Sequence, residues 1–155
     1  MRRSVPGFAV LFISGFCLLL YSCLEVACVD EIEAYVKANF YSFSTRQPII
    51  PDSLTIYGIS KVADKIYYKA KITPPALIPL RDSTDYSIFV IRINGVTDTL
   101  EFRYWSYPHL VTKECGYTIY HYIDTVYHTK HTIDSISNIY KNVTTLDGEN
   151  IGIYY

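Results

Sequence analysis

The side chains in this sequence that could carry out chemistry are, above all, its histidines and carboxylates. The four histidines are His109, His121, His128 and His131. On a strand, His121 and His128 are an odd number of residues apart and would face opposite sides of a sheet, so the spacing does not gather metal ligands. His121 could pair, as a base or acid, with any of Glu101, Asp124, Asp134 and Ser135. No GxSxG, HExxH or P-loop motif supports such a pair. We therefore expect no metal, no other cofactor and no enzymatic activity.

The first 23 residues have the pattern of an export signal. Arg2 and Arg3 give a positive start, and the apolar run from Gly7 to Leu20 is too short to cross a bilayer. The run leads into Leu20-Tyr21-Ser22-Cys23, which resembles the cleavage site of bacterial lipoproteins, with an aliphatic residue, a small residue and then the cysteine that accepts the lipid. We expect residues 1–22 to be a helical signal peptide that is removed, Cys23 to be lipidated, and residues 23–34 to be a tether.

This signal and cleavage site predict a protein that is exported and anchored by lipid in the bacterial cell envelope, with the outer membrane as its expected location. The alternatives are an ordinary secretory signal cut elsewhere, or an uncleaved helix at the membrane surface.

Two thiols remain if Cys23 is acylated and Cys17 is removed with the signal: Cys28 and Cys115. An oxidising compartment favours a disulfide between them, which would join the start of the domain to a late strand. The alternative is a pair of buried free thiols. A metal is not expected at either cysteine, because no CxxC motif or Cys/His cluster surrounds them.

The composition of the remaining chain favours strands. There are 16 Tyr against 7 Phe and 1 Trp, and tyrosine suits a half-buried pleated surface. Removing residues 1–22 takes away Arg2 and Arg3 and changes the net charge from −1 to −3. Because there is no basic excess to neutralise phosphates, nucleic acid is not an expected partner.

Short alternating segments separated by turn residues predict the elements of one domain over residues 35–155. The expected strands are 35–43, 54–59, 65–72, 86–93, 99–105, 109–113, 117–128, 132–140 and 151–155. Asn94-Gly95 predicts a hairpin, and residues Val96–Asp98 are expected to make its loop longer. Pro74, Pro75 and Pro79 are expected to exclude a regular ladder around Leu77-Ile78.

The spacing of these segments points to a β-sandwich or a barrel. Of the two we favour an immunoglobulin-like antiparallel β-sandwich, in which the last segment, Ile151–Tyr155, closes a sheet edge.

The segment from Phe102 to His109 is the best candidate for an interaction surface, because Trp, Tyr and Arg are the residues that dominate binding energies. Strand periodicity places Arg103, Trp105 and Tyr107 on one face and the residues between them on the other. One of the two faces must lie in the core, so Trp105 is either an exposed anchor or a core tryptophan.

Five Asp-Ser/Thr-apolar triplets resemble the acceptor sequence for O-glycosylation that some Gram-negative bacteria use on exported proteins. The candidate acceptors are Ser53, Ser83, Thr99, Thr125 and Ser135. The alternative is that each pair simply begins a turn and the apolar residue starts the next strand.

Several short motifs, in order, resemble a family of small uncharacterised envelope lipoproteins from Gram-negative bacteria, known only as a domain of unknown function. After the leader and its nearby second cysteine, they are Asp52–Gly58, Ile78–Leu80, Asp98–Leu100, Tyr107–His109, Glu114–Gly116 and Thr132–Ile136. The resemblance implies a β-rich domain behind a lipid anchor and a structural role for Cys28 and Cys115. It supplies no catalytic residues.

These observations together predict a non-enzymatic accessory or interaction subunit of an outer-membrane assembly. Its expected partners are the membrane, through the lipid on Cys23, and an outer-membrane β-barrel protein. The alternative is a surface module that binds carbohydrate or peptide.

Overall fold

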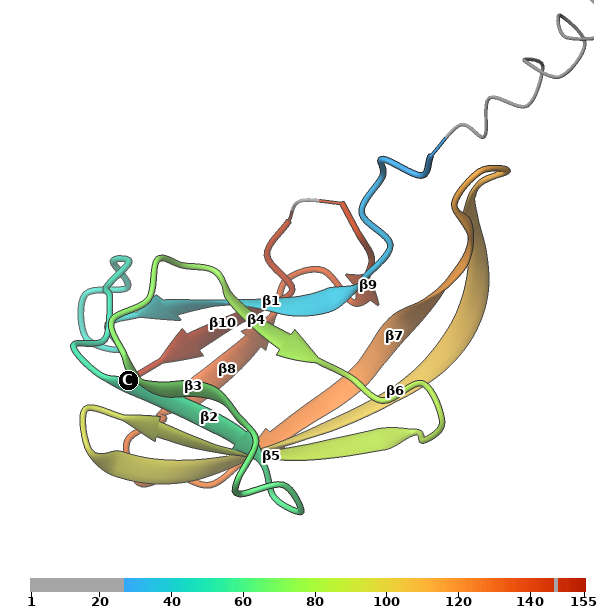
Figure 1. The fold of residues 1–155 in the computed structure, drawn as a ribbon. Coiled ribbons are helices and arrows are strands. Elements are labelled where there is room, and N and C mark those ends of the chain that lie inside the picture. The colour runs from blue at the N-terminus through green and yellow to red at the C-terminus, as the bar shows by residue number, and fades with distance from the viewer. Residues whose placement is uncertain (1–26, 147) are drawn as a thin grey trace, which may run out of the picture.

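Alternating apolar side chains build two sheets that pack face to face (Figure 1). The structure, a computed structural model, describes residues 27–146 and 148–155. Over these residues the strands are β1 (Tyr35–Tyr41), β2 (Leu54–Gly58), β3 (Lys65–Ala70), β4 (Ala76–Pro79), β5 (Tyr86–Ile93), β6 (Val96–Thr112), β7 (Gly116–His128), β8 (Ser135–Asn138), β9 (Asn142–Val143) and β10 (Ile151–Tyr154). The expected signal peptide and Cys23 lie outside the described residues. Among those described, no helix has the length and apolar character needed to cross a membrane.

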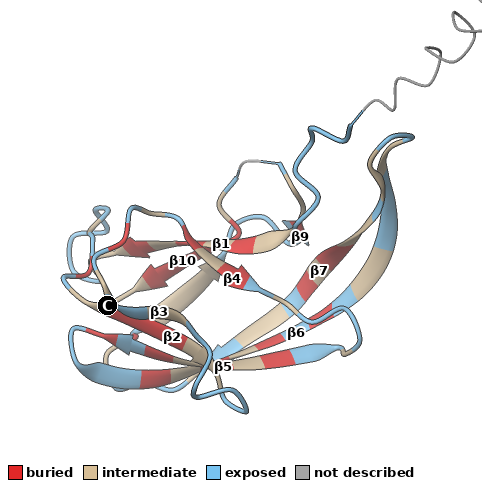
Figure 2. Ribbon diagram, viewed as in Figure 1, coloured by how far each residue is buried: buried red, intermediate tan, exposed pale blue. Residues whose placement is uncertain are grey.

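One sheet has the order β4-β1-β10-β8 and the other the order β3-β2-β5-β6-β7-β9. Their facing side chains form the core, as the red bands in Figure 2 show. On β1, Val36, Ala38 and Phe40 are buried while their neighbours are partly exposed. Burying an aliphatic or aromatic side chain in this way stabilises the fold by about 1.5–3 kcal/mol each. The prediction of an all-β sandwich is confirmed.

The carboxyl-terminal strand departs from the expected arrangement. β10 runs parallel to β1 and also pairs with β8, so it lies inside its sheet, and the prediction that it closes an edge is wrong. The close packing on both sides requires Gly152, because a Cβ there would lie 2.9 Å from Ser137 Oγ and 3.1 Å from the Tyr41 ring.

Prolines did not prevent pairing around Leu77-Ile78, so that prediction is wrong. β4 pairs with β1 at the edge of its sheet, with Ile78 opposite Val36 and Pro79 at the last paired position. Edge strands tolerate proline because one side of the strand needs no donors.

The β5–β6 hairpin turns through two residues only. Ile93 pairs directly with Val96, so the predicted lengthening of the loop by Val96–Asp98 is wrong. Asn94 and Gly95 have φ values of 49° and 94°, as a type I′ turn requires.

β6 is a single strand of 17 residues and not two short ones. It passes through Pro108, which is tolerated because β5 ends opposite Arg103 and leaves β6 with β7 as its one neighbour from there on. Residues 106–120, called the hairpin arm below, therefore extend past the rest of the sheet (Figure 1).

Candidate interaction surface

Register across the β6–β7 hairpin places aromatic side chains opposite one another. Trp105 pairs with Tyr122, and Tyr107 pairs with Tyr120. Because directly opposed residues in an antiparallel pair point to the same face, these four rings share one side of the hairpin. His109 is two residues beyond Tyr107 on that side. We call Trp105, Tyr107, His109, Tyr120 and Tyr122 the aromatic ladder.

Each ring of the aromatic ladder contacts a neighbouring ring of the ladder. The Trp105 centroid lies 5.4 Å from that of Tyr122 and 5.1 Å from that of Tyr107. Tyr107 meets Tyr120 edge-on at 6.1 Å, and His109 stacks on Tyr120 at 4.4 Å. Each such pair contributes about 0.5–1.5 kcal/mol beyond burial, so the ladder is a preformed surface.

Trp105 is 54% exposed, which resolves its two expected placements in favour of the surface. The core positions of this segment are taken by Phe102 and Tyr104, on the opposite face. Within the ladder Tyr120 is buried, and its hydroxyl lies 2.9 Å from Thr145 Oγ1.

Two cations lie beside the aromatic ladder. The Arg103 guanidinium bonds Glu101 at 2.6 Å and sits 5.2 Å from the Tyr86 ring centroid. Lys141 Nζ lies 5.6 Å from the centroid of Tyr122. The predicted surface residues Arg103, Trp105 and Tyr107 are thus brought together, with Arg103 already paired.

A second cluster, which sequence reasoning missed, lies on the other face of the hairpin. His121 is buried, its Nδ1 lies 2.8 Å from Ser106 Oγ, and its Nε2 lies 3.6 Å from Asp82 Oδ1. The Tyr104 hydroxyl donates to the carbonyl of Arg81 and so holds the loop that carries Asp82. Burial lowers the pKa of His121, and the nearby Asp82 carboxylate opposes that shift only in part.

One tautomer of the His121 ring satisfies both polar contacts of this cluster. With the ring proton on Nε2, Nδ1 of His121 accepts from the Ser106 hydroxyl and Nε2–H faces Asp82. His121 and Asp82 line a pocket of about 340 Å³, together with residues such as Ile32 and Leu80, but Ser106 is not part of its wall. The contacts of His121 with Ser106 and Asp82 hold the loop that carries Asp82 against the sheet.

Asp98 organises the connection between the two sheets. Its buried carboxylate accepts hydrogen bonds from the Thr129 hydroxyl at 2.6 Å and from the backbone N–H groups of His131, Thr132 and Ile133 at 2.8–3.0 Å. Burial alone would raise the pKa of Asp98, but these hydrogen bonds outweigh it and hold the pKa well below its ordinary value. The carboxylate thus fixes the loop by which the chain passes from β7 to β8.

The four histidines have different surroundings: His109 lies in the ladder, His121 lies behind it, His128 Nδ1 is bonded to the carbonyl of Thr129, and His131 lies beside Asp98. Over residues 27–146 and 148–155, no three His, Cys, Asp or Glu side chains are grouped to hold a metal.

The candidate O-glycosylation residues differ in accessibility. Ser83 is exposed in the turn between β4 and β5. The other four are partly buried: Ser53, Thr99, Thr125 and Ser135. Thr99 also follows the fully engaged Asp98, and its N–H donates to Thr129 Oγ1.

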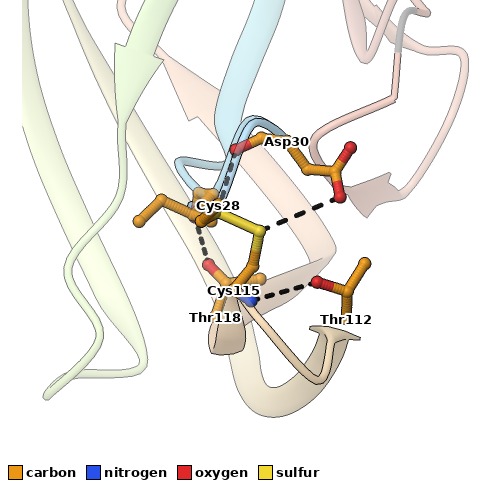
Figure 3. The surroundings of a disulfide bond; sticks show 6 residues. Cys28, Asp30, Thr112, Cys115 and Thr118 are labelled. Atoms are coloured by element: carbon orange, nitrogen blue, oxygen red, sulfur yellow. Dashed lines mark hydrogen bonds between the residues drawn. A yellow bond between two sulfur atoms is a disulfide. The ribbon is translucent and has the colours of Figure 1, made fainter. Parts of the chain in front are cut away.

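The predicted disulfide between Cys28 and Cys115 is confirmed, with Cα atoms 4.7 Å apart (Figure 3). Cys115 lies in the turn at the tip of the hairpin arm, where its N–H donates to Thr112 Oγ1 at 3.0 Å. The Thr118 hydroxyl donates to the carbonyl of Ile32, so the segment before β1 is held to the arm at a second point.

Fold and site together define an all-β sandwich domain with a projecting, disulfide-tied aromatic hairpin. A family model described as a family of unknown function, DUF6452, matches residues 53–155, more than half of the chain. The chain belongs to this family, and the prediction of an uncharacterised family is confirmed. Comparison with curated proteins and with solved structures finds no match. The matched region contains the aromatic ladder and Cys115, whereas β1 and Cys28 precede it.

Proposed function

We propose that this protein is a non-enzymatic, lipid-anchored envelope lipoprotein that binds another envelope component, an outer-membrane β-barrel protein, through its aromatic ladder. The aromatic ladder, in which Trp105 and His109 are exposed, is the observation that carries the proposal. Trp105, Tyr107 and Arg103 are of the types that dominate interface energies, and they lie on one face.

The ladder is also well prepared for binding. Its rings are already packed against one another on a paired hairpin, so little side-chain freedom remains to be lost on association. The disulfide further restrains the hairpin at its tip. A rigid aromatic surface suits a stable subunit contact better than a transient one.

The lipid anchor is supported by the amino-terminal pattern that ends at Cys23. The Cys28–Cys115 disulfide is consistent with an exported protein, because such bonds persist in oxidising compartments.

The test is crosslinking in intact cells of the native host, followed by affinity purification of the full-length protein. We expect one outer-membrane protein at near-stoichiometric yield, lost with Trp105→Ala/Tyr107→Ala. Tyr68→Ala is the matched control, because Tyr68 is an exposed aromatic on the distant strand β3. Cys23→Ala tests whether the lipid on Cys23 is needed to place the protein in the membrane. Equal recovery from the ladder variant and the control would contradict the proposal.

Carbohydrate binding is a second candidate, favoured by the geometry of two rings. The Trp105 and Tyr122 ring centroids lie 5.4 Å apart with planes inclined by 30°, and a sugar ring could stack on the exposed Trp105. Trp105 is the one tryptophan in the chain, so its fluorescence reports this site alone. A shift on adding glycans would favour this candidate over a protein partner.

A further inference from the structure

The tip of the hairpin arm gathers exposed apolar side chains. Leu110 and Tyr117 are direct cross-strand partners, and Tyr117 is 73% exposed. Val29, which is 90% exposed, follows the disulfide-bonded Cys28, and the exposed Ile32 is held beside Thr118 through its carbonyl. We call Val29, Ile32, Leu110 and Tyr117 the tip patch. In Figure 2 the end of the β6–β7 hairpin is coloured partly as exposed and partly as intermediate.

The tip patch joins two parts of the chain that are far apart in sequence. The disulfide and the bond from Thr118 to Ile32 fix the segment before β1 against the turn of the arm. The apolar residues of both parts are therefore held at the same end of the molecule.

The position of the tip patch relative to the proposed anchor is limited by chain length. Cys23 precedes Cys28 by five residues. Five extended residues span at most about 18 Å. Because Cys28 is bonded to Cys115, a lipid on Cys23 would hold the tip of the arm close to the bilayer surface.

We propose that the tip patch contacts the lipid bilayer that holds the anchor, and that this contact sets the orientation of the domain. The inference rests on the proposed lipid anchor. Val29, Ile32 and Leu110 would enter the interfacial region, and Tyr117 would place its ring among the headgroups, where amphipathic aromatic residues are favoured.

The charges around the tip specify the kind of lipid surface. The two segments that carry it also contain Asp30, Glu31, Glu33 and Glu114, against the single cation Lys113. Electrostatic attraction to anionic lipid is therefore absent, and contact depends on apolar burial. We expect the contact to favour zwitterionic headgroups and to change little with salt.

This orientation also places the aromatic ladder. Trp105 precedes Thr112, the end of β6, by seven residues. Seven strand residues rise about 24 Å, so an upright arm would present Trp105 roughly that far above the membrane surface. The ladder would therefore contact a part of the partner that lies outside the bilayer, next to its membrane-embedded domain.

The test uses the full-length lipidated protein in phosphatidylcholine vesicles that contain brominated phosphatidylcholine, which quenches nearby indoles. Tyr117→Trp is made in a Trp105→Phe background, with Tyr68→Trp in the same background as the control. We expect the indole at position 117 to lose most of its emission and the indole at position 68 to keep it. Leu110→Trp is a second probe of the patch, should the Tyr117 variant not fold.

The outcomes separate this inference from the anchor on which it rests. If mass spectrometry shows lipid on Cys23 but position 117 is not quenched, or positions 117 and 68 are quenched equally, the tip contact is overturned and the anchor stands. If Cys23 carries no lipid, the anchor and the tip contact both fall. If the indole at position 117 is not quenched, the tip patch is instead a candidate site for a protein partner.

Discussion

Cys28 and Cys115 are 87 residues apart in the chain, yet their Cα atoms lie 4.7 Å apart and their sulfurs are bonded. The bond joins the segment before β1, a strand of the four-stranded sheet, to the tip of a hairpin that extends the other sheet. The sandwich is thereby closed across its two sheets by a covalent link, at the end nearest the proposed anchor.

Replacing both cysteines tests the contribution of this link to stability. Cys28→Ser/Cys115→Ser is expected to lower the free energy of unfolding by about 2–4 kcal/mol, because the closed loop restricts the unfolded chain. Urea denaturation of the two forms measures the difference. The reduced wild type is the control and should resemble the double variant; an unchanged midpoint would show that the bond does not restrain the unfolded state.

Asp98→Asn tests the loop between β7 and β8. The amide would present N–H groups to backbone donors such as those of Thr132 and Ile133. Leaving such buried donors unpaired is expected to destabilise the fold by about 2–4 kcal/mol. Thermal or urea unfolding measures this loss. Asp134→Asn, an exposed neighbour, should leave stability nearly unchanged; equal effects of the two would contradict the assigned role of Asp98.

Stability should fall with acidification because of His121. Its folded-state pKa lies below the ordinary value of about 6.5, so the unfolded state binds a proton more readily. The stability contributed by neutral His121 is therefore present above about pH 6.5 and is lost as the pH falls through that value toward the folded-state pKa. Unfolding free energies between pH 8 and pH 5 measure the slope.

His121→Gln is the matched variant, since it keeps a polar side chain beside Ser106 and Asp82 but does not titrate. The other histidines remain in both proteins and cancel in the comparison. The same slope in wild type and variant would assign the effect to another group.

The sequence reveals local features of this fold better than distant ones. Asn94-Gly95 identifies its turn because both residues adopt positive φ at little cost. Strand periodicity places Trp105 and Tyr107 together, but a period of two does not say which face is buried. The burial of Phe102 and Tyr104 and the exposure of Trp105 settled that question.

The disulfide was predictable, but the contacts between distant strands and loops were not. The parallel placement of β10 beside β1 requires partners more than 100 residues apart, and nothing in Ile151–Tyr154 indicates direction. Asp82 meets His121 because the Tyr104 hydroxyl holds the loop of Asp82, a three-element arrangement without a sequence motif.

If O-glycans are attached, the structure predicts that Ser83 is modified first, because it is the exposed acceptor among the five triplets. Intact-mass analysis of protein from its native host should then show a glycan that Ser83→Ala removes and Thr99→Ala does not. A mass equal to peptide plus lipid alone would rule out modification.

The central claim, that the aromatic ladder binds an envelope partner, is tested most directly by a photo-crosslinking amino acid at position 107 in living cells. Position 68, an exposed aromatic on β3, is the control. We predict one crosslinked outer-membrane protein from position 107 and none from position 68. The same products from both positions, or none from position 107 while the protein remains in the membrane fraction, would contradict the claim.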